Sequence, residues 1–391
     1  MKFKVFSKIR FFFLIYSVMI FSACHDSDKI EPEYGERTVL IYMAADNNLN
    51  KDGETNIKSI LKGMEQTAGR LVIYIDPRYD VPRLLTVKGG KGCRLDTLET
   101  YTEENSASPE VLARVVKEVQ KRYPASSYGL VLWSHGLGWV PPEYSFPGGY
   151  AMRLPDPDMP RTKYYAEDEH PGTTGKAYMD IREMAARLPG HFNFILWDVC
   201  FMGGIEVAYE LRNKTDYMIA SPAEVISDGF PYEKIVPLFW GGEEAMKQIC
   251  REYYNHYNKY PVNSLWRSAV VGLVKTEELE PLAAKVRTLL AGKTDYARAW
   301  HYPLNQGGLP MVFFDFGDYI RKMTTEEEYN SFKKLLDRVV IYKAATEKLF
   351  GEEVPADKFS GLTSYIPFSE WSDMNTYYYT LDWGATVYEN N

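Results

Sequence analysis

The sequence predicts an α/β protein built around a mostly parallel β-sheet. Short apolar runs rich in Val, Ile and Leu recur along the first 225 residues, and segments with helical apolar periodicity separate them. Runs that are apolar throughout, rather than alternating, indicate strands buried on both faces. A helix between two such strands returns the chain to the same edge of the sheet, which makes the strands parallel. We therefore expect a sheet with helices on both faces.

The expected elements follow one another along the chain. Residues 37–50 are expected to form a strand followed by a loop. The other strands and one hairpin are assigned to residues 70–76, 82–101, 128–136, 192–200 and 216–225, and the helices to residues 56–66, 108–124, 179–189 and 203–213. Ser108 is the expected cap of the second helix, with Pro109 in its first turn, and Asp180 caps the third helix. Beyond about residue 241 the pattern is mainly helical, and its three apolar interruptions either extend the sheet or build a second subdomain. These interruptions are residues 269–274, 308–316 and 361–368.

Composition limits the class of protein. The chain has 391 residues, 45% hydrophobic and 25% charged, which is a globular balance and enough for one large domain or two ordinary ones. The formal net charge is −8 and no tract is dense in Lys and Arg. Nucleic acid is therefore not expected as a partner.

The first 24 residues have the pattern of an export signal. A basic start is followed by the apolar run 11–21, which is about half the length of a membrane-spanning helix, and then by the small residues that precede Cys24. This pattern resembles a bacterial lipoprotein signal, cut just before a cysteine that takes the lipid, although Phe21 stands where Leu is commoner. An ordinary cleaved signal peptide and a retained membrane anchor are the alternatives. Residues 25–36 are polar and are expected to form a tether.

The cysteine count is odd once Cys24 is lipidated. Cys93, Cys200 and Cys250 remain, so at least one thiol is unpaired or forms an intermolecular bond. A Cys93–Cys250 disulfide fits this count, but the sequence does not decide it.

Two of the expected strands end on reactive side chains, His135 and Cys200. One helix separates the strands, so they should be parallel neighbours whose carboxyl ends meet at the edge where such sheets place their active sites. An imidazole promotes ionisation of a nearby thiol, and the expected helix after Cys200 should also lower the pKa of that thiol. Gly136 leaves its backbone N–H open to a substrate carbonyl. The alternative is a buried structural cysteine and a core histidine.

Other chemical motifs are weak or absent. The sequence has no G-x-S-x-G around Ser134 and no H-E-x-x-H. Residues 167–170 (EDEH) either hold a hard cation or form a solvated acidic loop. Residues 172–177 (GTTGKA) follow no strand and end on Ala177 where a P-loop needs Ser or Thr, so we discard a nucleotide site.

The motifs around the two reactive residues resemble the clostripain family of cysteine peptidases, which shares its fold with caspases, gingipains and legumains. The resemblance is carried by WSHG and ILWDVC, and by an ordered set of further segments within residues 37–388, namely LIYMAADNNL, ASPAEVISDGFPY, FDFGDYI and GLTSYIPF. It implies a caspase-like three-layer α/β/α sandwich with a helical C-terminal extension. The catalytic core is then 37–240, and 241–391 is the C-terminal part of the same peptidase unit.

The resemblance also implies roles for particular residues. His135 corresponds to the catalytic histidine and Cys200 to the nucleophile, with an oxyanion hole formed by the N–H groups of Gly136 and Cys200. Asp198 matches an aspartate that lines the first specificity pocket, which implies cleavage after Arg or Lys. Phe201 departs from the smaller or aliphatic residue expected after the cysteine, which affects the shape of the pocket. A strand-end carboxylate satisfied by backbone amides is the alternative for Asp198.

The long segment 140–178 is a candidate site of self-cleavage. The family carries processing sites between the strands of the dyad, and here Arg153, Arg161, Lys163 and Lys176 are the basic residues that self-cleavage could use. Some members of the family use calcium, so Ca²⁺ is implied as an activator, while no residue is assigned to a metal site.

The sequence thus predicts an exported, lipid-anchored cysteine endopeptidase, attached to the outer membrane or cell surface and monomeric, that acts on peptides or proteins. An inactive peptide-binding lipoprotein on the same scaffold and a cell-wall amidase are the alternatives.

Overall fold

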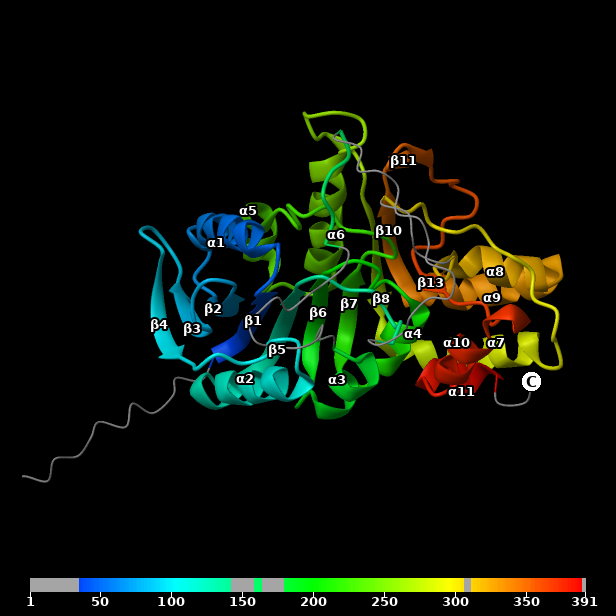
Figure 1. Ribbon diagram of the computed structural model, residues 1–391, viewed down its shortest axis with the longest axis horizontal. Helices are drawn as coiled ribbons and strands as arrows, with labels where there is room; N and C mark the ends of the chain where they lie inside the picture. The colour runs from blue at the N-terminus through cyan, green and yellow to red at the C-terminus, as the bar shows by residue number, and fades with distance from the viewer. Residues whose placement is uncertain (1–34, 142–157, 164–178, 306–310, 389–391) are drawn as a thin grey trace, which may run out of the picture. The chain divides into compact units, whose positions relative to one another are not determined.

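A nine-stranded sheet forms the centre of the protein in the computed structural model, which describes residues 35–141, 158–163, 179–305 and 311–388 (Figure 1). The order of the strands is β10-β8-β7-β6-β5-β1-β2-β3-β4. These strands are β1 (Gly35–Ala45), β2 (Arg70–Pro77), β3 (Arg83–Lys88), β4 (Arg94–Thr100), β5 (Ala125–Trp133), β6 (Phe192–Asp198), β7 (Thr215–Ala220), β8 (Val270–Lys275) and β10 (Val340–Ala345). The inner strands from β7 to β2 are parallel, and the outer ones pair antiparallel. The predicted mostly parallel sheet is confirmed.

Helices cover both faces of this sheet, as expected from its buried strands. On one face lie α1 (Asn50–Met64), α5 (Tyr232–Ile235) and α6 (Glu243–Asn258), and on the other α2 (Pro109–Arg122) and α3 (Ile181–Arg187), with α4 (Ile205–Glu210) packed on α3 (Figure 1). Ser108 and Asp180 cap α2 and α3 by accepting hydrogen bonds from backbone N–H groups of the first turn, as predicted. The architecture is the predicted three-layer α/β/α sandwich.

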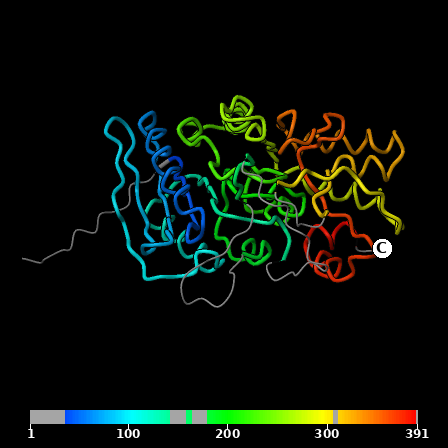
Figure 2. Tube along the Cα trace, turned by 45° about the horizontal axis from the view of Figure 1, so that its top comes forward, coloured from blue at the N-terminus to red at the C-terminus, as the bar shows by residue number. Residues whose placement is uncertain are grey.

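The C-terminal part divides its apolar segments between two sheets. The segment at 269–274 becomes β8 and extends the main sheet, whereas β9 (Phe314–Asp315) and β13 (Thr363–Ser364) pair with each other in a separate two-stranded sheet. Around them lie α7 (Leu279–Leu290), α8 (Phe316–Met323), α9 (Glu326–Val339), α10 (Ser372–Tyr378) and α11 (Asp382–Tyr388), grouped beside the main sheet in Figure 2. A further small hairpin joins β11 (Lys348–Leu349) to β12 (Glu352–Glu353). The described residues between Gly35 and Tyr388 cluster as a single compact unit.

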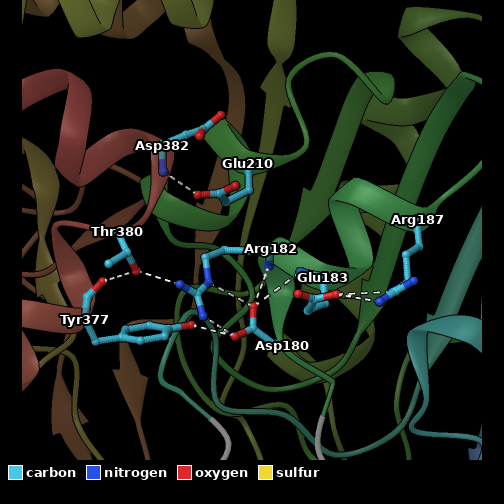
Figure 3. A network of polar contacts seen from close by, with 8 residues as sticks. All are labelled: Asp180, Arg182, Glu183, Arg187, Glu210, Tyr377, Thr380 and Asp382. Carbon is cyan, nitrogen blue, oxygen red and sulfur yellow. Dashed lines mark hydrogen bonds and ion pairs between the residues drawn. The ribbon is translucent and has the colours of Figure 1, made fainter.

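A polar network ties the start of α3 to the C-terminal helices (Figure 3). The Asp180 carboxylate accepts hydrogen bonds from the Arg182 guanidinium and from the Tyr377 hydroxyl. Arg182 also donates to the Thr380 hydroxyl at 2.6 Å, and its guanidinium lies 4.4 Å from the centre of the Tyr377 ring. Nearby, the Asp382 N–H donates to the Glu210 carboxylate. These contacts hold the C-terminal helices against α3, the helix between β5 and β6 in the chain.

The strand expected at 216–225 ends five residues earlier than predicted. β7 stops at Ala220, and residues 221–227 leave the sheet as an irregular segment because Pro222 removes a backbone donor and Ser221 bonds its own turn. This segment runs past Cys200, to which it bonds through Val225. It therefore becomes a wall of the candidate site rather than part of the sheet.

Candidate active site

His135 and Cys200 follow neighbouring strands at the same edge of the sheet. β5 and β6 are parallel, with Trp133 opposite Asp198, and each reactive residue lies two positions beyond the end of its strand. A Cβ on Gly136 would lie 2.3 Å from a methyl carbon of Val199 and 3.4 Å from the Cys200 carbonyl oxygen. Only glycine permits this close approach of the two strand ends. The predicted adjacency of the strands is confirmed.

The His135 ring is buried and is held by Asn48. Its Nε2 lies 2.7 Å from the Asn48 side-chain oxygen, which accepts the ring proton and leaves the lone pair on Nδ1. Burial is the main reason that the pKa of His135 is lowered to about 3; the positive charges of Lys163 and Arg161 contribute to this shift, and a backbone hydrogen bond with Lys163 opposes it. The imidazole is therefore neutral here. Asn48 was not found by sequence reasoning, and its only signal is a polar residue just beyond the end of β1.

The Cys200 thiol is fully buried and neutral. Its Sγ accepts a hydrogen bond from the Val225 N–H at 3.1 Å and lies 3.7 Å from the Val225 carbonyl oxygen. Burial raises the pKa of Cys200 well above its usual value, and the charge of Glu224 adds to this. The sequence led us to expect a pKa lowered by the following helix, and this expectation is wrong for the structure described. The helix α4 starts at Ile205 and has six residues, too little to offset complete burial.

Residues 161–163 lie in the site and pair antiparallel with residues 225–227. The Lys163 N–H donates to the Val225 carbonyl at 2.8 Å, and the Ser227 N–H donates to the Arg161 carbonyl at 2.9 Å. Thr162 forms the antiparallel bridge with Ile226 between them. Pairing of this kind is how extended peptides bind to an exposed backbone edge.

The Lys163 carbonyl oxygen lies beside Gly136, the residue that follows His135. It accepts a hydrogen bond from the Gly136 N–H at 3.3 Å, and the backbone of Lys163 also contacts the His135 ring. Gly136 therefore directs its backbone donor at the carbonyl of the peptide bond between Lys163 and Tyr164. Tyr164 itself lies outside the described residues.

The Lys163 side chain fills a closed pocket whose base is Asp198. Its Nζ lies 2.7 Å from a carboxylate oxygen of Asp198 and 4.3 Å from the centre of the Trp133 ring, and both charged side chains are fully buried. The other Asp198 oxygen accepts hydrogen bonds from the Tyr232 hydroxyl at 2.9 Å and the Phe230 N–H at 3.4 Å. Burial lowers the pKa of Lys163, while the charge of Asp198 opposes that shift.

Gly229 gives the pocket its room. Its φ is +72°, and a Cβ there would lie 2.4 Å from an Asp198 oxygen and 2.8 Å from the Lys163 Nζ. Side chains other than glycine would therefore occupy the space of the lysine head group. The pocket fits one extended, cationic side chain.

The residue after Cys200 has an unusual conformation. Phe201 has a φ of 60°, and its ring stacks on Phe313 with ring centres 4.3 Å apart. A non-glycine residue in this region costs about 1–3 kcal/mol and is held by the surrounding structure. The aromatic ring thus packs against the C-terminal part of the chain.

Among the described residues, one group of carboxylates fits a hard cation. Oxygen atoms of Asp46, Asp76 and Glu103 lie within 4.8 Å of one another, and calcium takes such oxygen ligands. Sequence reasoning did not single out these residues. The segments 167–170 and 172–177 lie outside the described residues.

The remaining sequence predictions have mixed outcomes. Cys24, Arg153 and Lys176 lie outside the described residues. Cys93 and Cys250 are free thiols, so the disulfide that the sequence left open is not formed. No helix in the described ranges is both long and apolar enough to cross a membrane.

Comparison with known proteins decides the family. A family-wide sequence model described as the clostripain family matches residues 41–383. The chain belongs to the clostripain family. Clostripain of Hathewaya histolytica is 26% identical to it over 228 residues, which is 51% of this chain and 41% of that protein. The chain thus matches less than half the length of this curated relative.

Solved structures of clostripain-family proteases match nearly the whole chain. An inactive zymogen C11 protease from Parabacteroides distasonis is 34% identical with a TM-score of 0.74, and the match covers 91% of this chain and 99% of that one. A secreted C11 cysteine protease from Bacteroides thetaiotaomicron, in complex with an irreversible peptide inhibitor, is 28% identical with a TM-score of 0.76. That match covers 91% of this chain and 100% of the other. These matches confirm the caspase-like fold predicted from the sequence.

Proposed function

We propose that this protein is an exported cysteine endopeptidase that cleaves after Lys or Arg, with Cys200 as nucleophile and His135 as its partner. The observation that carries the proposal is the position of Lys163. Its side chain fills the Asp198 pocket while its carbonyl faces the Gly136 N–H. A basic substrate residue bound in the same way would present its own carbonyl to the dyad.

The mechanism follows from the placement of these groups. The thiolate of Cys200 attacks the substrate carbonyl carbon, and the oxygen gathers charge that the N–H groups of Gly136 and Cys200 stabilise. Asn48 keeps the His135 proton on Nε2, so Nδ1 takes the thiol proton and later passes it to the leaving amine. Water then hydrolyses the thioester and restores Cys200.

We further propose that the described state is latent and that cleavage after Lys163 activates it. Of the basic residues named for self-cleavage, Arg161 and Lys163 lie within the described residues, and Lys163 is the one held in the pocket. With the cleft filled, the thiol and the imidazole are both neutral. Departure of the segment admits water, which favours the ionised pair.

The first experiment uses the chain from His25 and peptides that differ only at the residue before the cut, which is Arg, Lys, Leu or Ala. We expect cleavage after Arg and Lys alone, and none with Cys200→Ala.

N-terminal sequencing should find a new terminus at Tyr164, formed at a rate independent of protein concentration because Lys163 occupies its own cleft. A fully active chain with no cut would overturn self-activation. No cleavage of any peptide, even after limited trypsin treatment, would favour the peptide-binding alternative, and indifference to the basic residue would favour an amidase.

Lipid attachment at Cys24 is part of the same proposal. It rests on the signal-like sequence of residues 1–24, and the secreted relative supports export. A palmitate analogue fed to expressing bacteria should label the full chain and not Cys24→Ser. Equal labelling of both chains would contradict the anchor.

Calcium activation is tested with the same assay. If the ion binds, Asp46, Asp76 and Glu103 are the described residues that would hold it, and it would order the segment beyond β1 that contains Asn48. Calcium should then raise both the Tm and the activity of chelator-treated protein, and Asp46→Asn should require more calcium for both. An unchanged Tm and activity would exclude this role.

A further inference from the structure

The residue before Lys163 is recognised through its side chain. Thr162 is buried, and its hydroxyl donates to a Glu224 carboxylate oxygen at 2.5 Å. Glu224 is 1% exposed and belongs to the segment that pairs with 158–163. In the proposed cleavage, Thr162 is the second residue on the amino side of the cut bond, next to the lysine in the Asp198 pocket.

The Glu224 carboxylate is held in place independently of Thr162. Its other oxygen accepts a hydrogen bond from the Asn305 backbone N–H at 2.7 Å. The Asn305 side chain in turn donates to the Pro160 carbonyl at 2.8 Å. One carboxylate thus connects recognition of the Thr162 hydroxyl with recognition of the backbone two residues further out.

We propose that Glu224 selects a hydroxyl-bearing residue, Thr or Ser, at the second position before the cut, so that the substrate class is peptides with Thr-Lys, Thr-Arg, Ser-Lys or Ser-Arg before the cleaved bond. The inference rests on the proposed function and adds a second selective position to it. A site built to bond a hydroxyl discriminates strongly against an analogue that lacks it, because a buried polar atom is then left without a partner. Valine has nearly the shape of threonine and provides the sharpest comparison.

The protonation of Glu224 affects the strength of this selection. Burial raises the pKa of Glu224 to about 7 in the intact chain. Above that pH the carboxylate is ionised and accepts the hydroxyl hydrogen bond more strongly, because hydrogen bonds to charged acceptors are about twice as strong as neutral ones. The preference for threonine should therefore increase from pH 6 to pH 8.

The decisive experiment compares two fluorogenic peptides with processed enzyme, acetyl-Pro-Arg-Thr-Lys and acetyl-Pro-Arg-Val-Lys, each ending in an aminocoumarin. We expect kcat/KM to be about tenfold higher for the threonine peptide. In Glu224→Ala the ratio should fall to about one. Asp52 contacts Arg161, the third residue before the cut, so Asp52→Asn should leave the ratio unchanged. The ratio cancels any effect of Glu224 on the Cys200 thiol, because both peptides meet the same nucleophile.

Self-cleavage supplies a second readout that needs no change in Glu224. Thr162→Val should slow the cut after Lys163 by about tenfold, and Thr162→Ser should restore most of the rate. The inference would be overturned if the wild-type enzyme cleaves the two peptides equally well while still requiring Lys or Arg immediately before the cut. The proposed function would then still stand. Failure to cleave either peptide would overturn both.

Discussion

Two acidic residues contact the same short segment, and their surroundings differ sharply. Asp198 pairs with Lys163 where both side chains are fully buried, whereas Asp52 pairs at 2.7 Å with an Arg161 side chain that is 62% exposed. An exposed pair contributes about 0–1 kcal/mol because water and salt screen it. Removing one partner of a buried pair costs about 3–5 kcal/mol because the other charge is left without compensation. Asp198, in the interior of the cleft, should therefore have a large effect on which peptides are cleaved, and Asp52, at its rim, a small one.

The largest expected effect comes from Asp198→Asn. In processed enzyme, kcat/KM for peptides with Lys before the cut should fall about 100-fold or more, because the buried ammonium loses its counter-charge. Peptides with Ala at that position should show no comparable fall. Equal losses on both peptides would mean that Asp198 supports the fold rather than the pocket.

The pH dependence of stability tests the closed interior of the cleft. The folded pKa of His135 is about 3, and that of an unfolded histidine is about 6.5, so only the unfolded chain gains a proton between these values. Stability from this group is complete above pH 6.5 and is lost as the pH falls toward 3, by about 2 kcal/mol at pH 5. Urea unfolding of Cys200→Ala at pH 7.5 and 5.0 should show this loss, and Cys200→Ala/His135→Asn should lack it. Identical pH responses would contradict a neutral, buried ring.

Asn48→Ala tests orientation of the dyad rather than binding. Without the Asn48 oxygen the ring can turn, so kcat should fall about tenfold while KM changes little. Asn48→Asp retains the acceptor, and its negative charge should raise the pKa of His135 and move the acid limb of the rate profile to higher pH. A rise in KM alone would assign Asn48 to substrate contact.

The smallest effect is expected for Asp52→Asn. Peptides with Arg at the third position before the cut should lose about threefold in kcat/KM at low salt and almost nothing at high salt, since the contact is exposed on the arginine side. A loss as large as that of Asp198→Asn would remove the distinction between interior and rim.

Local patterns were sufficient to predict the scaffold and the adjacency of the two reactive strands. Short stretches of sequence were enough to predict the apolar strands, the helix caps at Ser108 and Asp180, and the helix that connects β5 to β6. The structure confirms these features. The contacts of the candidate site were not predictable in this way. Asn48 meets His135 across 87 positions, and Thr162 meets Glu224 across 62, through irregular segments that have no periodicity to read.

The ionisation state of the thiol was also beyond the sequence pattern. The sequence correctly predicted a helix after Cys200, within residues 203–213, and a helix start favours a thiolate. Access of water to the Cys200 thiol depends on the residues packed around it, which belong to segments 158–163 and 221–227. Burial outweighs the short helix, so a correct local prediction led to a wrong pKa direction.

The seam between β5 and β6 has a consequence for the processed protein. A cut after Lys163 leaves β1 to β5 and His135 in one polypeptide, and β6, β7, β8, β10 and Cys200 in the other. The two pieces share one continuous hydrogen-bonded ladder, with five residue pairs from Gly129–Phe194 to Trp133–Asp198. If this cut occurs as proposed, the mature enzyme would be a heterodimer formed from a single gene product, and neither fragment would hold both His135 and Cys200. Its activity would end when the fragments dissociate, and denaturing gels would show two bands where native mass spectrometry finds one species.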